Sequence, residues 1–256
     1  MSFVIIAHRG YSSEAPGNTI AAFDLALEAG FPHIEFDVQL CSDNIPVVIH
    51  DRTVDRTTNG SGQVNQISAA DIQKLEAGAS FENASVRFYM KSRVPTLQEV
   101  LDRYKGKAHL YIELKSEERD LPHQVAKLLD KNGWIKPDDP IIHSVPGVTI
   151  ISFNLDQLEL SKSLMPNVCI GWLIMELSER EIQIAKQNHF HMILPYVHAL
   201  THEQVKTTYS NGLELATWGV QNIQDFRHAL QNEVFAIAVD WPRLALDLVN
   251  KRPNGN

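Results

Sequence analysis

Five ionisable residues lie at or next to short apolar runs in the first fifty residues. His8 and Arg9 directly follow a run of the kind that forms a buried strand. Glu35 and Asp37 lie two apart in a second run, so on a strand their carboxylates would project to the same side. Buried carboxylates this close need a cation or a proton between them. His50 ends a third run, and these residues together predict metal-assisted acid–base chemistry on an anionic substrate.

Glu113 and Lys115 repeat the two-residue spacing in a later apolar segment. Together with Glu35 and Asp37, Glu113 would complete an all-oxygen set on neighbouring strands. Such a set suits one hard divalent cation, Mg²⁺ or Ca²⁺. A salt bridge to Arg9 or Lys115 is the alternative for any single acid, but three acids together favour the metal.

The elements that would position these residues alternate along the chain. Strands are predicted over 3–8, 33–38, 109–114, 148–153, 168–174, 191–195, 213–217 and 235–239. Helices are predicted over 18–30, 96–105, 120–132, 155–164, 178–188, 201–210, 222–231 and 242–250. This alternation predicts an α/β fold of parallel units, a (β/α)₈ TIM barrel, with a doubly wound open sheet as the alternative. In a barrel, reacting residues lie at the C-terminal ends of the strands, where these polar residues occur.

One long segment, about 51–93, interrupts the alternation. A turn signal at 42–44 indicates a hairpin after the second strand, and a polar, glycine-bearing stretch follows it. The segment is too long for an ordinary loop, so we expect a small inserted subdomain over one face of the barrel. Three of its aromatic residues could line an apolar channel or form the subdomain core: Phe81, Phe88 and Tyr89.

Composition narrows the class of protein. With 23 basic and 31 acidic side chains the net charge is −8, which argues against a nucleic-acid or anionic-membrane surface. No stretch approaches the length of a membrane span, and the N-terminus lacks the basic segment of a signal peptide. Cys41 and Cys169 match no metal spacing. We expect residues 1–256 to form one cytoplasmic domain without stable membrane association, and its oligomeric state is not predicted.

Taken together, these residues resemble the glycerophosphodiester phosphodiesterase family. The matching stretches follow in order along the chain: 8–10, 18–19, 34–38, 46–51, 55–62, 94–97, 112–115, 152–153, Trp218 and 239–240. The resemblance implies a barrel with a small insertion after the second strand, and a divalent metal. It also implies hydrolysis of glycerophosphodiesters, such as glycerophosphocholine or glycerophosphoethanolamine, to glycerol 3-phosphate and an alcohol.

The resemblance also implies a role for each candidate residue. Catalysis falls to His8 and His50, phosphate contacts to Arg9 and Lys115, and metal ligation to Glu35, Asp37 and Glu113. We expect Trp218, at a strand end, to pack against the glycerol carbons, with a structural role at the barrel mouth as the alternative.

The chain departs from the family pattern at three places. Gly17 stands where a Glu is usual, Asp43-Asn44 replaces a common Asp-Gly turn, and the segment after Trp218 reads Gly219-Val220-Gln221-Asn222. The missing Glu leaves the predicted core machinery intact. It concerns the rim of the site, and therefore substrate preference or rate.

Two other functions remain open. A related barrel phosphodiesterase acting on lysophospholipids or sphingolipids would need an apolar channel. A barrel that only binds a phosphate ligand is the other possibility, but binding alone has no need of two proton-transfer groups. The sequence leaves open which histidine is the acid, and whether water or the substrate's own 2-hydroxyl is the nucleophile.

Overall fold

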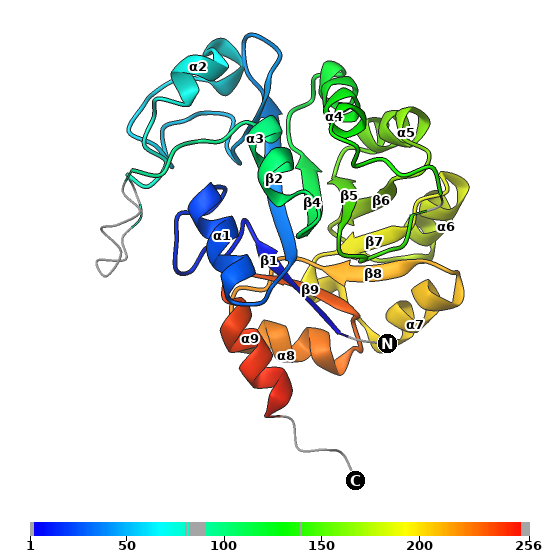
Figure 1. The fold of residues 1–256 in the computed structure, drawn as a ribbon. Helices are drawn as coiled ribbons and strands as arrows, with labels where there is room; N and C mark the ends of the chain where they lie inside the picture. The colour runs from blue at the N-terminus through cyan, green and yellow to red at the C-terminus, as the bar shows by residue number, and fades with distance from the viewer. Residues whose placement is uncertain (1–2, 80, 82–90, 139, 252–256) are drawn as a thin grey trace.

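A computed structural model describes residues 3–79, 81, 91–138 and 140–251 (Figure 1). The strands are β1 (Val4–His8), β2 (His33–Leu40), β3 (Pro46–Val48), β4 (His109–Leu114), β5 (Gly147–Ser152), β6 (Cys169–Ile174), β7 (Met192–Pro195), β8 (Glu214–Thr217) and β9 (Ala236–Val239). The helices are α1 (Ile20–Glu28), α2 (Ala69–Ile72), α3 (Leu97–Tyr104), α4 (Asp120–Lys131), α5 (Leu155–Leu164), α6 (Glu179–Gln187), α7 (His202–Ser210), α8 (Ile223–Gln231) and α9 (Pro242–Asn250). Short 3₁₀ turns lie at Val64–Gln66 and Val197–Ala199.

The described strands form one closed sheet. Its order is β1-β9-β8-β7-β6-β5-β4-β2-β3, and β1 also pairs with β2, which closes the barrel. Every pairing between barrel strands is parallel, whereas β3 pairs antiparallel with β2 as the second arm of a hairpin. The predicted (β/α)₈ barrel is confirmed, and the closure excludes the open sheet.

Helix starts follow the local chemistry of the chain. Asn18 adopts a left-handed backbone with φ of 61°, which cannot continue a helix. The Thr19 hydroxyl then accepts a hydrogen bond from the Ala22 amide, and α1 begins at Ile20. Asn154 caps α5 in the same way. The observed bounds of the predicted strands and helices differ from the predicted bounds by at most two residues.

Buried side chains form separate cores on the two faces of the barrel. Ile5 and Ala7 belong to the large cluster between strands and helices, whereas Val4 and Ile6 belong to a second cluster. Because successive strand residues point to opposite faces, the second cluster fills the barrel interior. Tyr111 is its largest member. The polar residues at the strand ends lie at one end of this packed interior.

The predicted insertion lies between β3 and α3, and its helix α2 lies to one side of the barrel (Figure 1). Apolar residues of the insertion form a small separate core together with Cys41 and Val47 of the β2–β3 hairpin. The other members of this insertion core are Ile49, Val54, Val64, Ala69, Ile72 and Val94. Phe81 is half-buried, while Phe88 and Tyr89 lie outside the described residues. In the part of the chain that the structure describes, every helix is too short or too polar to cross a bilayer.

Candidate active site

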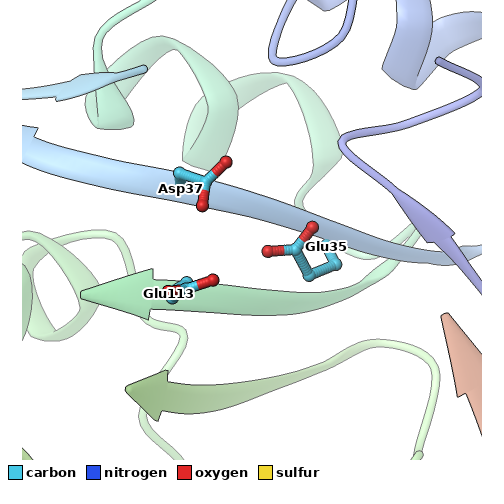
Figure 2. Close-up of side chains that lie close together, drawn as sticks. All are labelled: Glu35, Asp37 and Glu113. Carbon is cyan, nitrogen blue, oxygen red and sulfur yellow. The ribbon is translucent and has the colours of Figure 1, made fainter. Parts of the chain in front are cut away.

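Three carboxylates gather where β2 and β4 run side by side. Asp37 is in register with Glu113, and Glu35 lies two residues earlier on β2, on the same face (Figure 2). An oxygen from each carboxylate lies within 4.8 Å of the others. All three side chains are buried, with exposures of 5% for Glu35, 1% for Asp37 and 8% for Glu113. The two-residue spacing of the sequence therefore produces a compact acidic cluster.

Burial and the closeness of the three carboxylates shift their pKa values. Burial, followed by the charge of Asp37, raises the pKa of Glu35 to about 7 and that of Glu113 to about 8. Burial acts in the same direction on Asp37, but nearby Arg9, His50 and Lys115 outweigh it and lower its pKa. Without a cation, the cluster would therefore hold protons near neutral pH.

Two positively charged side chains, those of Arg9 and Lys115, contact the cluster. The Arg9 Nε lies 3.1 Å from Oδ2 of Asp37, and the Arg9 backbone amide donates to Oε2 of Glu35 at 3.1 Å. The Lys115 Nζ lies 2.8 Å from Oε1 of Glu113. Two positive charges do not balance three ionised carboxylates, so either bound protons or a further cation must supply the remaining positive charge.

This donor set fits a hard divalent cation. All of its ligands are oxygens, and they lie close enough together to bind one ion. In addition, Oδ1 of Asp37 is buried without a hydrogen-bond partner among the described residues, and the Lys115 Nζ lies 3.7 Å from it. A buried carboxylate oxygen without a hydrogen bond is costly, and a bound cation would satisfy it.

A tight turn after β1 positions Arg9. Arg9 itself has φ of 56°, and Gly10 follows with φ of 82°. A Cβ at Gly10 would lie 2.6 Å from the backbone carbon of Ala22, so only glycine fits against α1. On the other side of the turn, the Asn18 amide donates to Oδ2 of Asp37 at 2.8 Å, and Oδ1 of Asn18 accepts from the Asp37 backbone at 3.2 Å. The turn therefore fixes Arg9 and Asp37 relative to each other.

Each of the two predicted histidines has its Nδ1 beside a carboxylate. The Nδ1 of His8 lies 2.7 Å from Oδ1 of Asp240, at the end of β9, and Ser12 Oγ lies 2.7 Å from the same oxygen. The Nδ1 of His50 lies 2.6 Å from Oδ1 of Asp51. Nε2 is therefore the nitrogen of each ring that is left for chemistry. In His8 it faces the acidic cluster, 3.9 Å from Oε2 of Glu35.

Burial and charge act differently on the two imidazoles. For His8, burial lowers the pKa, but the hydrogen bond to Asp240 and the charge of Glu35 outweigh it, and the pKa is raised. For His50, burial dominates over the charges of Asp37 and Asp51, and the pKa is lowered. The two imidazoles therefore differ in proton affinity, and His8 holds a proton more tightly than His50.

Two cavities meet at these residues. They share His8, Arg9, His50 and Asp240. The first, of about 290 Å³, we call the barrel lobe. Beyond the shared residues it is lined by Ile6, Glu35, Tyr111, Glu113, Lys115, Ile151, Phe153, Leu173, Leu194, Thr217, Trp218, Gly219, Val220, Gln221 and Ala238. The second, of about 270 Å³, we call the insertion lobe. Beyond the shared residues it is lined by Ser12, Pro16, Gly17, Asn18, Val48, Ile49, Arg56, Thr57, Ala77, Phe81 and Val94.

Trp218 lies on the wall of the barrel lobe. Its indole Nε1 donates to the carbonyl of Ile174 at 3.2 Å, which fixes the ring at the end of β8. The Phe153 ring stands perpendicular to it, with centroids 5.1 Å apart. Gly17 lies on the insertion lobe, where an added Cβ would be 3.2 Å from that of Arg9. The departure from the family pattern at Gly17 therefore lies on a cavity wall.

The structure brings all of the predicted site residues to one end of the barrel. It also adds residues to which sequence reasoning gave no role: Asp240, Asp51, Ser12 and Arg56 around the histidines, and Asn18 beside Asp37. Asp240 directly follows a predicted strand and Asp51 directly follows His50, so both carried a positional signal. Arg56 lies in the stretch 55–62 that matches the family, but its partner could not be read from the sequence, and Ser12 lies in a polar loop.

Comparison with known proteins agrees with this geometry. Residues 8–244 match the model of the glycerophosphoryl diester phosphodiesterase family. A glycerophosphodiester phosphodiesterase of Caldanaerobacter subterraneus is 35% identical over 252 residues, covering 98% of this chain and 99% of the relative. A Bacillus subtilis protein of the same name is 33% identical, covering 93% of this chain and 84% of the relative.

Solved structures point the same way. A phosphodiesterase of Oleispira antarctica, in complex with the product sn-glycerol-3-phosphate, superimposes with a TM-score of 0.86 at 25% identity, covering 97% of each chain. A glycerophosphodiester phosphodiesterase of Agrobacterium tumefaciens has a TM-score of 0.78 at 29% identity, covering 96% of this chain and 100% of that one. The resemblance seen in the sequence is confirmed: the chain belongs to the glycerophosphoryl diester phosphodiesterase family and is an enzyme of that class.

Proposed function

We propose that this enzyme hydrolyses glycerophosphodiesters to glycerol 3-phosphate and an alcohol in a metal-dependent reaction in which His8 and His50 transfer protons. One observation carries the proposal. Both imidazoles line the barrel lobe together with two members of the acidic cluster, Glu35 and Glu113, and each has its Nδ1 held by a carboxylate. A site that only binds a phosphate ligand has no need of two oriented proton-transfer groups.

Glu35, Asp37 and Glu113 would hold the cation, which we propose to be Mg²⁺ or Ca²⁺ because the donor set is entirely oxygen. When bound there, such an ion neutralises negative charge on the phosphate as the phosphorus becomes five-coordinate.

Arg9 and Lys115 are the proposed phosphate contacts. Both side chains are mostly buried, with exposures of 24% and 21%, and both line the barrel lobe. A guanidinium can bind two phosphate oxygens at once, whereas an ammonium acts as a point charge. Arg9 would therefore orient the phosphate, and Lys115 would add positive charge on the side of Glu113.

The two histidines divide the proton transfers between them. One takes the proton from the attacking oxygen, and the other donates a proton to the leaving alkoxide. Asp240 holds His8 and Asp51 holds His50 through Nδ1, which leaves Nε2 of each ring for proton transfer. Both rings line both cavities, and holding them in place would lower the entropic cost of reaching the transition state.

The two lobes suggest how the substrate lies. Because His8, Arg9 and His50 line both lobes, we assign the phosphate to the junction, from which its two ester arms would extend into different lobes. We assign the glycerol arm to the barrel lobe, where Trp218 can pack against its carbons, and the alcohol to the insertion lobe. Cavities of about 290 and 270 Å³ suit small groups better than a long acyl chain. This favours glycerophosphodiesters over lysophospholipids as substrates.

The decisive experiment measures glycerol 3-phosphate release from glycerophosphocholine, with and without chelator. We expect release that chelator abolishes and Mg²⁺ or Ca²⁺ restores. Lysophosphatidylcholine, assayed in parallel, should be hydrolysed far more slowly. Faster hydrolysis of the lysophospholipid would replace the proposed substrate class, and full activity in excess chelator would remove the metal from the mechanism.

We place the enzyme in the cytoplasm. Cys41 and Cys169 are both buried as free thiols, as expected in a reducing compartment. Its proposed partner is the small-molecule substrate, because no basic surface for nucleic acid is expected from a net charge of −8.

A further inference from the structure

Side-chain contacts connect Arg56 of the insertion to His50 through Asp51. The Arg56 Nε lies 2.5 Å from Oδ2 of Asp51, and the Arg56 Nη2 lies 3.0 Å from its Oδ1. The same Oδ1 lies 2.6 Å from Nδ1 of His50. Arg56 therefore grips both oxygens of the carboxylate that holds the imidazole.

Hydrogen bonds from Gln39 fix the backbone of residues 49–51, which carries His50 and Asp51. Gln39, buried on β2, places its amide nitrogen 3.1 Å from the carbonyl oxygen of Ile49, 2.9 Å from that of His50 and 2.6 Å from that of Asp51. The His50 backbone is thereby tied to the barrel. What remains to be set is the rotation of the imidazole side chain, and the Asp51 carboxylate is its polar neighbour.

The Asp51 carboxylate cannot hold a fixed rotation alone. Its side chain is 24% exposed, so water competes for its oxygens. A two-pronged contact with a guanidinium defines the plane of a carboxylate as well as its position, which a single ammonium does not do. The hydrogen bond from Arg56 is also the largest influence on the pKa of Asp51, which is lowered to about 2, so the carboxylate stays charged.

The position of Arg56 depends on the insertion. Val54, two residues before it in the same loop, is fully buried in the small insertion core. The Val54 amide donates to the carbonyl of Gly62, and the Val54 carbonyl accepts from the Thr58 amide. The insertion core therefore determines where the guanidinium lies, although 61% of the Arg56 side chain is exposed.

We propose that Arg56 is a positioning residue that acts on catalysis through Asp51, so that the insertion sets the orientation of the His50 imidazole. The proposal rests on the proposed catalytic role of His50. It gives the insertion a part in the reaction rate in addition to any part in selecting the alcohol.

Arg56→Ala should lower kcat by about tenfold and leave KM within about twofold, because misorienting a catalytic group slows the reaction without removing a substrate contact. Arg56→Lys should give an intermediate kcat, since lysine keeps the positive charge but cannot form the two-pronged contact with the Asp51 carboxylate. Arg52→Ala is the matched control. Arg52 belongs to the same loop and also forms one exposed ion pair, with Glu117, but it contacts neither histidine. It should keep wild-type kcat and KM.

A double-mutant cycle tests whether Arg56 acts through Asp51. In an Asp51→Asn background, Arg56→Ala should change kcat by less than about twofold, because coupled residues are not additive. Free guanidinium should raise kcat of Arg56→Ala and leave the Arg52→Ala enzyme unchanged. Thermal unfolding midpoints of all variants should lie close to that of wild type, because the pair is exposed.

Three results would overturn the proposal. The first is a wild-type kcat in Arg56→Ala. The second is a raised KM with unchanged kcat in that variant, which would make Arg56 a substrate contact in the insertion lobe. The third is that Arg56→Ala lowers kcat equally in the wild-type and the Asp51→Asn backgrounds. His50→Ala separates this failure from failure of the proposed function. If that variant is inactive while Arg56→Ala is normal, only the positioning role is lost, whereas an active His50→Ala enzyme would refute the function on which it rests.

Discussion

The Nδ1 of His8 lies 2.7 Å from Oδ1 of Asp240, a contact that joins the first barrel strand to the end of the last. The two residues are 232 positions apart in the chain. They meet because β1 pairs in parallel with β9 as the barrel closes. The orientation of a proposed catalytic group therefore depends on complete folding of the barrel.

Removing this carboxylate should impair the reaction more than the fold. Asp240→Ala should lower kcat by about ten- to a hundredfold, because the His8 ring loses its fixed orientation. Ser12→Ala, which removes the second contact of the same oxygen, should have a smaller effect. Steady-state kinetics of both variants check this, and equal kcat values in Asp240→Ala and wild type would contradict it.

The histidines themselves should be more sensitive. His8→Ala and His50→Ala should each lower kcat by about 10²-fold or more, the usual scale for loss of a positioned acid or base. Both proteins should remain folded, because each side chain lies at the end of an apolar run and outside the barrel core. Circular dichroism checks the fold. A variant with near wild-type kcat would show that its histidine only neighbours the site.

Metal removal should affect stability as well as activity. The three buried carboxylates repel one another, so a bound divalent cation should raise the unfolding temperature, by an amount that grows with the logarithm of its concentration. Because the pKa of Glu35 is about 7 and that of Glu113 about 8, protons compete with the metal, and its affinity should fall as the pH is lowered from 8 to 6. Calorimetric titration at both pH values measures this. Equal affinities would mean that the carboxylates are not the ligands.

The spacing of polar residues at strand ends was enough to predict most of this site. Glu35, Asp37 and Glu113 could be placed on one face because side chains alternate along a strand. Asp240 could be placed at a strand end but not paired with His8, because that contact depends on how the barrel closes. Arg56 lies in a stretch that matches the family, but its contact with Asp51 could not be predicted, because that contact depends on how the insertion folds. Local periodicity predicts elements and faces, whereas contacts between distant loops need the folded backbone.

A group of histidines at the other end of the barrel, in which His109 is buried and His33 and His143 are half-buried, should make the protein sensitive to acid. Burial lowers the pKa of His33 to about 4, that of His109 to about 3 and that of His143 to about 4. These folded-state values lie below the unfolded value of 6.5, so below pH 6.5 the unfolded chain binds protons that the native protein does not. Their contribution to stability is therefore present above pH 6.5 and lost as the pH falls toward 4.

The contribution of one histidine can be isolated by substitution. Glu35 and Glu113 titrate in the opposite sense over part of this range, so the test compares variants at each pH instead of using the wild-type profile alone. His33→Phe should lose less unfolding free energy than wild type between pH 6 and 4, by up to about 1.4 kcal/mol per pH unit. Urea unfolding at several pH values measures the difference, and parallel profiles would show that His33 takes up its proton in the folded state.

The insertion lobe should govern which alcohol is accepted. Its wall includes Phe81 and Thr57 from the insertion and Gly17 from the turn before α1, whereas the proposed glycerol contact Trp218 lies in the other lobe. Phe81→Ala should therefore change the ratios of kcat/KM among glycerophosphocholine, glycerophosphoethanolamine and glycerophosphoglycerol. Trp218→Ala should lower all three by a similar factor, because every substrate carries the same glycerol phosphate. A change of ratios in Trp218→Ala, with constant ratios in Phe81→Ala, would exchange the assignments of the two lobes. Constant ratios in both, with lower stability of Phe81→Ala, would make Phe81 a packing residue of the insertion.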